Sequence, residues 1–178
     1  MCGRLVIYSP LSSYAEYLEA ESQGSMQASY NIPPTSMIPA CRLDPDGERV
    51  LTPMRWGLVP RWSRGPDSRF SMFNARAETV HEKPAFRSAF KSRRCLIPAD
   101  GFYEWKAENG KQPYFFHRNG EDPMAMAGLW EHWQDAQGNS IFSCTIIVTG
   151  ANALMQPVHD RMPVLLDPAQ FAVWLEPA

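Results

Sequence analysis

Short apolar or alternating segments recur along most of this chain, and many of them are bounded by glycine, proline or asparagine. This pattern predicts β-strands separated by turns, because successive side chains of a strand point to opposite faces of a sheet. We expect strands at residues 3–8, 37–43, 48–54, 94–98, 101–106, 112–118, 124–130 and 141–149. Their close succession favours a meandering, mainly antiparallel sheet.

Helix signals are fewer. Ser9-Pro10 offers an N-cap and a first-turn proline for a helix that carries apolar residues at 11, 14, 17 and 18. Asp167-Pro168 offers the same pair for a final helix, and a short helix is expected at residues 84–91. A few helices should therefore flank the sheet.

Two stretches have the composition of loops. Residues 22–36 are polar and end in a proline-rich segment that cannot continue a helix. Residues 56–71 contain Pro60, Gly65 and Pro66, together with the aromatic residues Trp62 and Phe70. This second stretch predicts a long surface loop, and such loops in compact domains are often functional.

The length and composition limit the architecture. At 178 residues, 44% hydrophobic and 20% charged, the chain buries one ordinary core, so we expect a single domain over residues 1–178. Predominant strands with a few helices place it in the α+β class. No apolar run approaches the roughly 20 residues that span a bilayer, and no secretory signal is apparent, so we expect a cytoplasmic protein without membrane contact.

The cysteines do not form a recognisable set of metal ligands or disulfide partners. They stand at Cys2, Cys41, Cys95 and Cys144, far apart and without nearby histidines. A zinc site normally shows closely spaced cysteine or histidine pairs. We therefore expect no disulfide, no metal and no other cofactor, and interpret the last three cysteines as small buried residues.

Charge is unevenly distributed along the chain. The formal net charge is −2, yet the stretch from Arg49 to Arg94 holds eleven of the 17 basic residues and only three of the 19 acidic ones. Trp56, Trp62 and Phe70 are interleaved with these arginines. Such a combination suits a groove that binds phosphates and stacks unpaired bases. The alternative is a solvated basic surface over aromatic residues of the core.

Cysteine at position 2 has a chemical consequence if Met1 is removed, because one residue then carries both an α-amine and a thiol. The reference pKa values of these groups are about 8 and about 8.5. The amine condenses with an aldehyde to an imine, and the thiolate adds to the imine carbon to give a five-membered thiazolidine. The alternative is that Cys2 is an incidental second residue.

Asn74, Arg76 and Glu78 supply an amide, a guanidinium and a carboxylate at alternating positions. In an extended segment all three side chains lie on one face. There Asn74 can bond a bound sugar, Arg76 can bind a phosphate and Glu78 can orient the arginine. A purely structural salt bridge between Arg76 and Glu78 is the alternative.

Two further segments carry groups that can move protons. Glu104 lies among aromatic residues on an expected strand, where a carboxylate can have a raised pKa and exchange protons near neutrality. The alternative is a solvent-facing glutamate on an edge strand. His159 and Arg161 lie just before an apolar run. There His159 can shuttle a proton near neutrality and Arg161 can hold a phosphate. The alternative is that His159 is only a hydrogen-bonded structural residue.

Six motifs occur in a fixed order along nearly the whole chain. They are Met1–Arg4, Tyr30–Pro34, Trp56–Pro60, Asn74–Glu78, Arg94–Trp105 and His159–Pro163. In these motifs the sequence resembles the SOS response-associated peptidase (SRAP) family, whose eukaryotic members act on abasic sites. The resemblance implies a single β-rich domain of the α+β class with a barrel-like, mainly antiparallel sheet. Family members commonly continue beyond the final helix with another strand, so we expect an exposed sheet edge here.

The resemblance also implies a function. Cys2 becomes N-terminal and forms a thiazolidine with the ring-opened sugar aldehyde of an abasic site in single-stranded DNA, which shields the lesion from strand cleavage. It implies catalytic roles for Cys2, Asn74, Glu104 and His159, and DNA contacts for Arg4, Trp56, Trp62, Arg76 and Arg161. The expected partner is damaged DNA at the nucleoid, and the expected state is a monomer, because one lesion needs one Cys2 and no heptad is present.

The sequence leaves two other functions open. A general thiol peptidase would use Cys2 as nucleophile with Glu104 or His159 as base, but would leave the basic aromatic stretch without a purpose. A non-catalytic single-strand binder would use arginines and tryptophans alone, and would leave Asn74 without one. Within the family interpretation, Met1 is released either by the same site or by a separate aminopeptidase.

Overall fold

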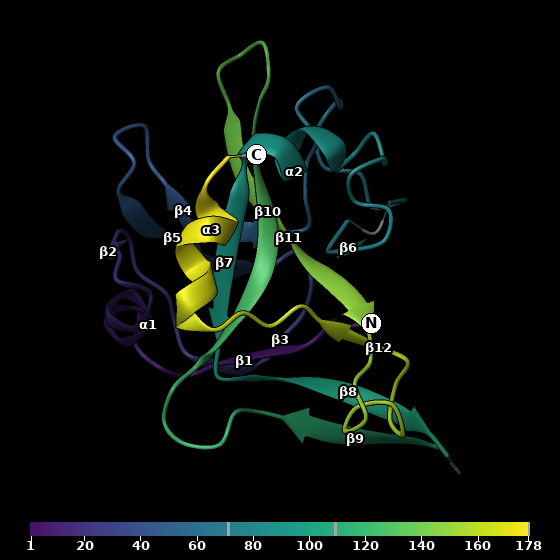
Figure 1. The fold of residues 1–178 in the computed structure, drawn as a ribbon. Helices are drawn as coiled ribbons and strands as arrows, with labels where there is room; N and C mark the ends of the chain where they lie inside the picture. Colours follow the sequence, from purple (N-terminus) through teal and green to yellow (C-terminus); the bar gives the residue numbers. More distant parts are fainter. Residues whose placement is uncertain (71, 109, 178) are drawn as a thin grey trace.

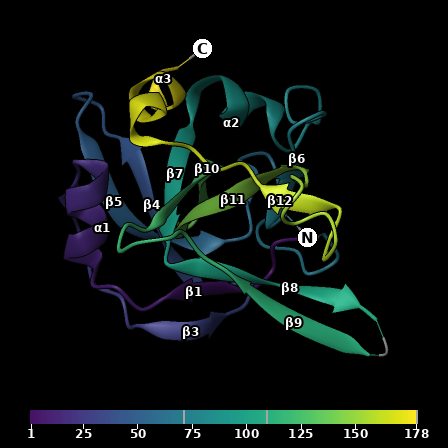
Figure 2. The same ribbon diagram turned by 60° about the horizontal axis from the view of Figure 1, so that its bottom comes forward.

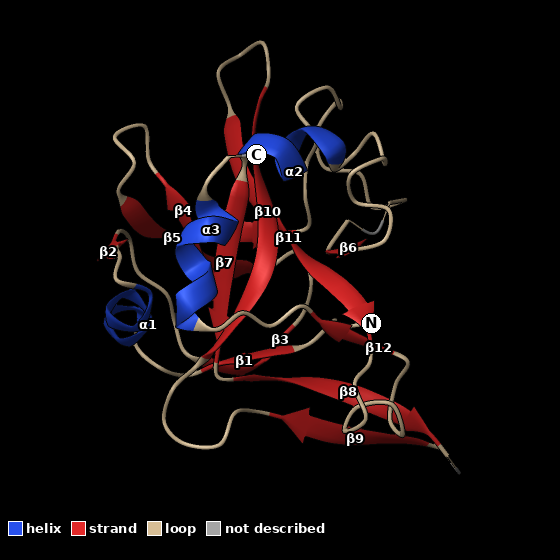
Figure 3. Cartoon of the chain, viewed as in Figure 1, coloured by secondary structure: helices blue, strands red, loops and turns tan. Residues whose placement is uncertain are grey.

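Strands make up most of the fold in the computed structural model, which describes residues 1–70, 72–108 and 110–177 (Figures 1 and 3). The strands are β1 (Leu5–Ile7), β2 (Glu21–Ser22), β3 (Ser29–Ile32), β4 (Met37–Leu43), β5 (Arg49–Trp56), β6 (Asn74–Arg76), β7 (Arg94–Ala99), β8 (Gly101–Ala107), β9 (Lys111–Phe116), β10 (Met124–Gln134), β11 (Ser140–Gly150) and β12 (Arg161–Pro163). The helical segments are α1 (Leu11–Leu18), α2 (Arg87–Ser92), the 3-10 turn η1 (Pro168–Gln170) and α3 (Phe171–Leu175).

Five strands close into a barrel. Strands β11, β10, β7, β4 and β5 follow one another as antiparallel neighbours, and β5 then pairs with β11 in parallel, with Arg55 opposite Ser143. Strands β2, β6 and β12 extend this sheet by pairing with β5 or β11. Closure removes the free edges that an open sheet of these strands would have.

A second sheet, in the order β3-β1-β8-β9, lies below the barrel in the views of Figures 1 and 2. Its strands are antiparallel, with Leu5 opposite both Ile32 and Phe102. These three side chains are buried and belong to the same core cluster as residues of the barrel such as Leu96 and Met54. The two sheets therefore share one hydrophobic core.

Three helices flank the barrel. Helix α1 contacts β2 and β5, α2 contacts β7 and β10, and α3 packs on β7. The expected α+β fold, with one β-rich domain, a barrel and a few flanking helices, is confirmed. No helix in the described part of the chain is both long and apolar enough to cross a membrane.

Two local predictions need correction. Residues 22–36 are not all loop, because Ser29–Ile32 forms strand β3 at the edge of the second sheet. Ser9 does not cap α1, since its backbone N–H and hydroxyl both donate to the Asp100 carboxylate, at 2.9 and 2.6 Å. The cap at the other end of the chain is confirmed, because Asp167 and Gln170 form a capping box that begins η1.

The predicted loop after β5 is present, and its last residue, Ser71, lies outside the described residues. So does Ala178. The segment between β5 and β6 crosses the outside of the barrel and returns to the sheet at Asn74.

Candidate active site at the N-terminus

The amine of the first residue lies in a polar site built from distant segments. The Met1 nitrogen is 2.9 Å from Nε2 of His159 and 3.1 Å from Oε1 of Glu104. Glu104 comes from β8, and His159 comes from the segment just before β12. With Met1 in place, the structure describes the unprocessed form of the chain.

Cys2 is fully buried next to this site. Burial raises the pKa of its thiol well above the usual range, and the negative charge of Glu104 raises it further, while the terminal ammonium opposes both effects. The thiol is therefore protonated at neutral pH in the unprocessed form. Any reaction at sulfur requires a neighbouring base to accept that proton.

Glu104 is a buried carboxylate whose charge acts on this thiol. Its side chain is 3% exposed, so the alternative of a solvent-facing glutamate is wrong. Strand β8 turns Phe102 and Glu104 toward the core and leaves Tyr103 and Trp105 on the other face. Oε1 lies within ion-pair distance of the Met1 amine but has no hydrogen bond of good geometry from the described residues. An under-satisfied buried carboxylate oxygen can accept a further hydrogen bond.

His159 is held by the backbone that follows it. The N–H of Arg161 donates to Nδ1 of His159 at 3.0 Å, which leaves Nε2 directed to the Met1 amine. The Asp160 carboxylate lies 3.2 Å from Nδ1 but is largely exposed. We take the backbone bond as the orienting one, because an exposed carboxylate is weakly held.

Asn74 contributes an unused acceptor. It begins β6, which pairs with β11 in parallel so that Asn74 lies opposite Ile146. Its Nδ2 donates to the Phe73 carbonyl at 2.9 Å, whereas Oδ1 is buried without a hydrogen-bond partner among the described residues. Buried acceptors are rarely left unpaired, so a bound group with a donor would stabilise this amide.

Glu78 does not pair with Arg76 as the extended pattern predicted. Strand β6 ends at Arg76, and Glu78 instead forms two bonds of 2.8 Å with the guanidinium of Arg161. This pair lowers the pKa of Glu78 to about 2. Arg161 also donates to the Val148 carbonyl at 3.1 Å. To bind a phosphate, Arg161 would have to exchange its carboxylate partner, while Arg76 is exposed.

Comparison with known proteins places this arrangement in a family. A family model described as SOS response associated peptidase (SRAP) matches residues 1–178. The chain belongs to the SRAP family. The abasic site processing protein YoqW of Bacillus subtilis is 40% identical over 182 residues, which cover 99% of this chain and 81% of that protein.

More distant SRAP relatives include the abasic site processing protein HMCES of Xenopus tropicalis, 37% identical, where the match covers 79% of this chain and 51% of that protein. A crystal structure of a Bacteroides thetaiotaomicron protein superposes with a TM-score of 0.88 at 26% identity, covering 99% of this chain and 82% of that one. The fold is thus the one seen in this relative.

The two tryptophans expected on the DNA path of this SRAP chain lie in different environments. Trp62 is 69% exposed, as a base-stacking residue requires. Trp56 is fully buried, and its ring is unavailable to a base, so the expectation for Trp56 needs correction. Its Nε1 donates to the Phe73 carbonyl at 3.0 Å, the same oxygen that holds Asn74. Trp56 therefore holds the backbone beside Asn74.

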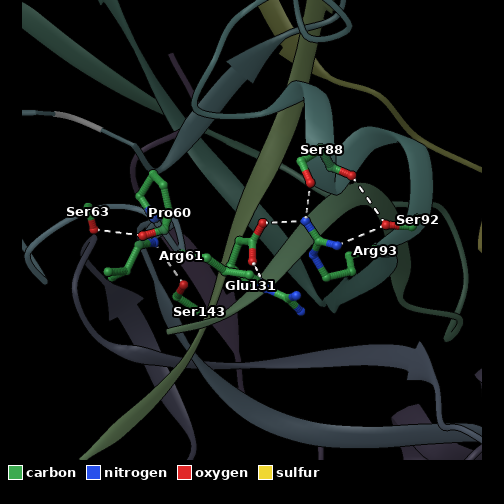
Figure 4. A network of polar contacts seen from close by, with 9 residues as sticks. Pro60, Arg61, Ser63, Ser88, Ser92, Arg93, Glu131 and Ser143 are labelled. Carbon is green, nitrogen blue, oxygen red and sulfur yellow. Dashed lines mark hydrogen bonds and ion pairs between the residues drawn. The ribbon is translucent and has the colours of Figure 1, made fainter. Parts of the chain in front are cut away.

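The arginines of the basic stretch divide in a similar way. Arg4 is partly exposed and donates to Asn31 at 3.2 Å. Arg61 and Arg93 are both bound to the buried carboxylate of Glu131, at 2.9 and 2.7 Å (Figure 4). Part of the positive charge counted in the sequence is therefore neutralised within the protein.

Glu131 is a residue that sequence reasoning missed. Together with its neighbours on β10 and β11, it anchors the loop that carries Trp62. The Trp133 ring nitrogen donates to the Ser63 carbonyl at 2.9 Å, and the hydroxyl of Ser143 accepts from the Val59 N–H at 2.8 Å. Beneath the loop lies a cavity of about 730 Å³. The available signal was a single carboxylate within the apolar run of β10.

No group of three metal-ligating side chains is found in the described residues. Cys41, Cys95 and Cys144 are all buried and free. Burial raises the pKa of each thiol, and raises that of Cys41 to about 12. They are inert core residues, whereas Cys2 stands beside a base.

Proposed function

We propose that this chain captures abasic sites in single-stranded DNA by a covalent bond to Cys2 after Met1 has been removed. The observation that carries the proposal is the docking of the chain's first amine between Glu104 and His159, next to a buried cysteine. The SRAP relatives named abasic site processing proteins support DNA with abasic sites as the substrate.

The chemistry needs only the two groups of an N-terminal cysteine and an aldehyde. The ring-opened sugar of an abasic site presents that aldehyde at C1′. The amine adds to this carbon and one water leaves, forming an imine; the thiol then adds across the C=N bond, its sulfur to carbon and its proton to nitrogen. The product is a thiazolidine, and the net change is the loss of one water.

The site residues take complementary roles in this reaction. Glu104 accepts the thiol proton and returns it to the nitrogen as sulfur adds to the imine carbon. His159 exchanges protons with the amine during imine formation, since its Nε2 already faces an amine in the unprocessed chain. The free Oδ1 of Asn74 accepts a hydrogen bond from a hydroxyl of the opened sugar.

Non-covalent encounter with DNA precedes the bond. Arg76 and Arg4 are accessible cations near the site, and Trp62 is an exposed ring of the anchored loop. Arg161 joins them only if phosphate displaces Glu78. Binding through these groups should weaken as salt rises, whereas the completed thiazolidine should survive salt and denaturant.

Release of Met1 by the same site is a second activity that a specific observation favours. The bond to be cut precedes a fully buried residue, where a separate aminopeptidase has little access in the folded chain. Attack of the Cys2 sulfur on the Met1 carbonyl carbon would transfer the acyl group to sulfur and free the Cys2 amine; water would then release methionine. Glu104 would take the thiol proton. Broader peptidase activity has no comparable support.

Intact mass spectrometry under denaturing conditions tests the proposal. Purified protein is incubated with a single-stranded oligonucleotide carrying one abasic site, and a matched oligonucleotide with a tetrahydrofuran in its place serves as the aldehyde-free control. A starting mass without Met1, increased by one oligonucleotide minus one water, is the expected result. Processed protein with no mass shift would refute covalent capture.

A further inference from the structure

The outward face of the second sheet carries a group of aromatic rings, of which Tyr8, Tyr30 and Phe115 are exposed and Tyr103 is half-buried. We refer to these four as the outer aromatic face. Alternation along β8 buries Phe102 and turns Tyr103 away from the core, and the exposed Tyr8 directly follows β1, whose three residues are all buried. Tyr8, Tyr30 and Phe115 are 49%, 66% and 43% exposed.

The rings are held in place by one another. Tyr8 and Tyr30 stack with centroids 5.4 Å apart and planes 21° from parallel, and Tyr103 lies 5.2 Å from Phe115. Phe115 also lies so close over Gly101 that a Cβ there would collide with its ring. A ring fixed in this way loses little further freedom when another flat group stacks on it.

The position of this face points to one occupant. The two central strands of the sheet also build the active site, because β1 follows directly from Cys2 and β8 carries Glu104 on its opposite face. Arg4 lies between them, with its carbonyl bonded to the Tyr103 N–H at 3.0 Å. Exposed rings beside a cation are the features on which unpaired bases stack.

We infer that the outer aromatic face, on the side of the second sheet opposite Glu104, is a stacking surface for the unpaired bases that flank the lesion. The inference rests on the proposed function and extends it to the undamaged part of the strand. Apolar rings of this kind seldom gather on a monomer's surface without a ligand. Because stacking does not read hydrogen bonds, the surface accepts any sequence.

The experiment measures non-covalent affinity by fluorescence anisotropy with tetrahydrofuran-containing oligonucleotides, which cannot form the covalent bond. The single-stranded flank is lengthened from about two to about eight nucleotides, first on one side of the lesion and then on the other. Wild-type protein should bind more tightly with the longer flank on one side only. The double variant Tyr8→Ala/Tyr30→Ala should lose about fivefold or more of that gain.

Phe142→Ala is the matched control, because Phe142 is 37% exposed but lies on β11, outside this sheet. It should keep the full effect of flank length. Thermal unfolding verifies that each variant is folded, and Phe115→Leu provides a second variant if the double one is not. The gain should persist at high salt, since stacking releases few counterions.

Equal affinity for short and long flanks in the wild type would overturn the inference, as would an unchanged gain in folded Tyr8→Ala/Tyr30→Ala. Concentration-dependent self-association that this variant abolishes, with DNA affinity unaffected, would also overturn it, and would assign the face to a second copy of the chain. Covalent capture is measured separately with true abasic DNA. Loss of the flank effect with intact crosslinking therefore rejects only the stacking surface.

Discussion

Removing the carboxylate of Glu131 is the sharpest test of how the loop between β5 and β6 is held. Glu131→Ala leaves the guanidinium of Arg93, whose side chain is 11% exposed, without its anion. Breaking a buried pair on one side typically costs about 3–5 kcal/mol. The hydroxyls of Ser88 and Ser92 still bond Arg93, at 2.7 and 2.9 Å, which reduces this loss.

Loss of the second ion pair of Glu131, with Arg61, adds less to the destabilisation. The Arg61 side chain is 55% exposed, and such a pair contributes at most about 1 kcal/mol. We therefore expect Glu131→Ala to lower the free energy of unfolding by about 3 kcal/mol, and Arg61→Ala to lower it by less than about 1 kcal/mol. Glu131→Gln should lower the free energy of unfolding by an amount between these two, because glutamine keeps the volume of the side chain but not its charge.

Urea unfolding followed by tryptophan fluorescence measures these differences. With a slope of about 2 kcal/mol per molar urea, Glu131→Ala should lower the midpoint by about 1.5 M. Arg61→Ala is the matched control for removal of the exposed half of the network. A loss below about 1 kcal/mol for Glu131→Ala at an unchanged slope would show that Arg93 does not depend on this carboxylate, and the reasoning would be wrong.

Three further predictions concern the site. Cys2→Ala should abolish the covalent product on a denaturing gel while leaving non-covalent DNA affinity within about twofold; a normal covalent yield would overturn the mechanism. Glu104→Gln should slow crosslinking or Met1 release by about a hundredfold, measured by intact mass over time, and unchanged rates for both would remove it from the site. The pKa of Glu78 is lowered to about 2, so its pair with Arg161 is formed above the ordinary pKa of the carboxyl and lost only as pH falls through about 2. DNA affinity should accordingly show no inflection from this pair at neutral or mildly acidic pH, and a Glu78→Gln variant that removes such an inflection would contradict the assignment.

The sequence predicted the strands of the barrel well, because each is a short apolar segment whose ends are marked by turn residues. It did not predict how the ring closes. The parallel pairing of β5 with β11 joins residues about ninety positions apart, and no local pattern encodes it. Strand β3 was missed because Ser29–Ile32 forms an edge strand with few apolar residues.

The site was predictable where a motif carried it and unpredictable where tertiary contacts decide. Glu104 and His159, which come from separate motifs, lie together at the first amine, and their catalytic roles stay predictions. Composition alone does not distinguish an arginine facing solvent from one bound to a buried carboxylate, as Arg61 and Arg93 are. It likewise gives Trp56 and Trp62 the same weight, although only Trp62 is accessible.

The closing of the ring by β11 also determines when the chain becomes reactive during its synthesis. Asn74 reaches the site only because β6 pairs with β11, and His159 follows that strand by nine residues. A nascent chain that has not yet released β11 from the ribosome therefore has Cys2 and Glu104, but it lacks His159 and the strand that positions Asn74. We therefore expect the proposed capture to gain the assistance of Asn74 and His159 only in finished molecules.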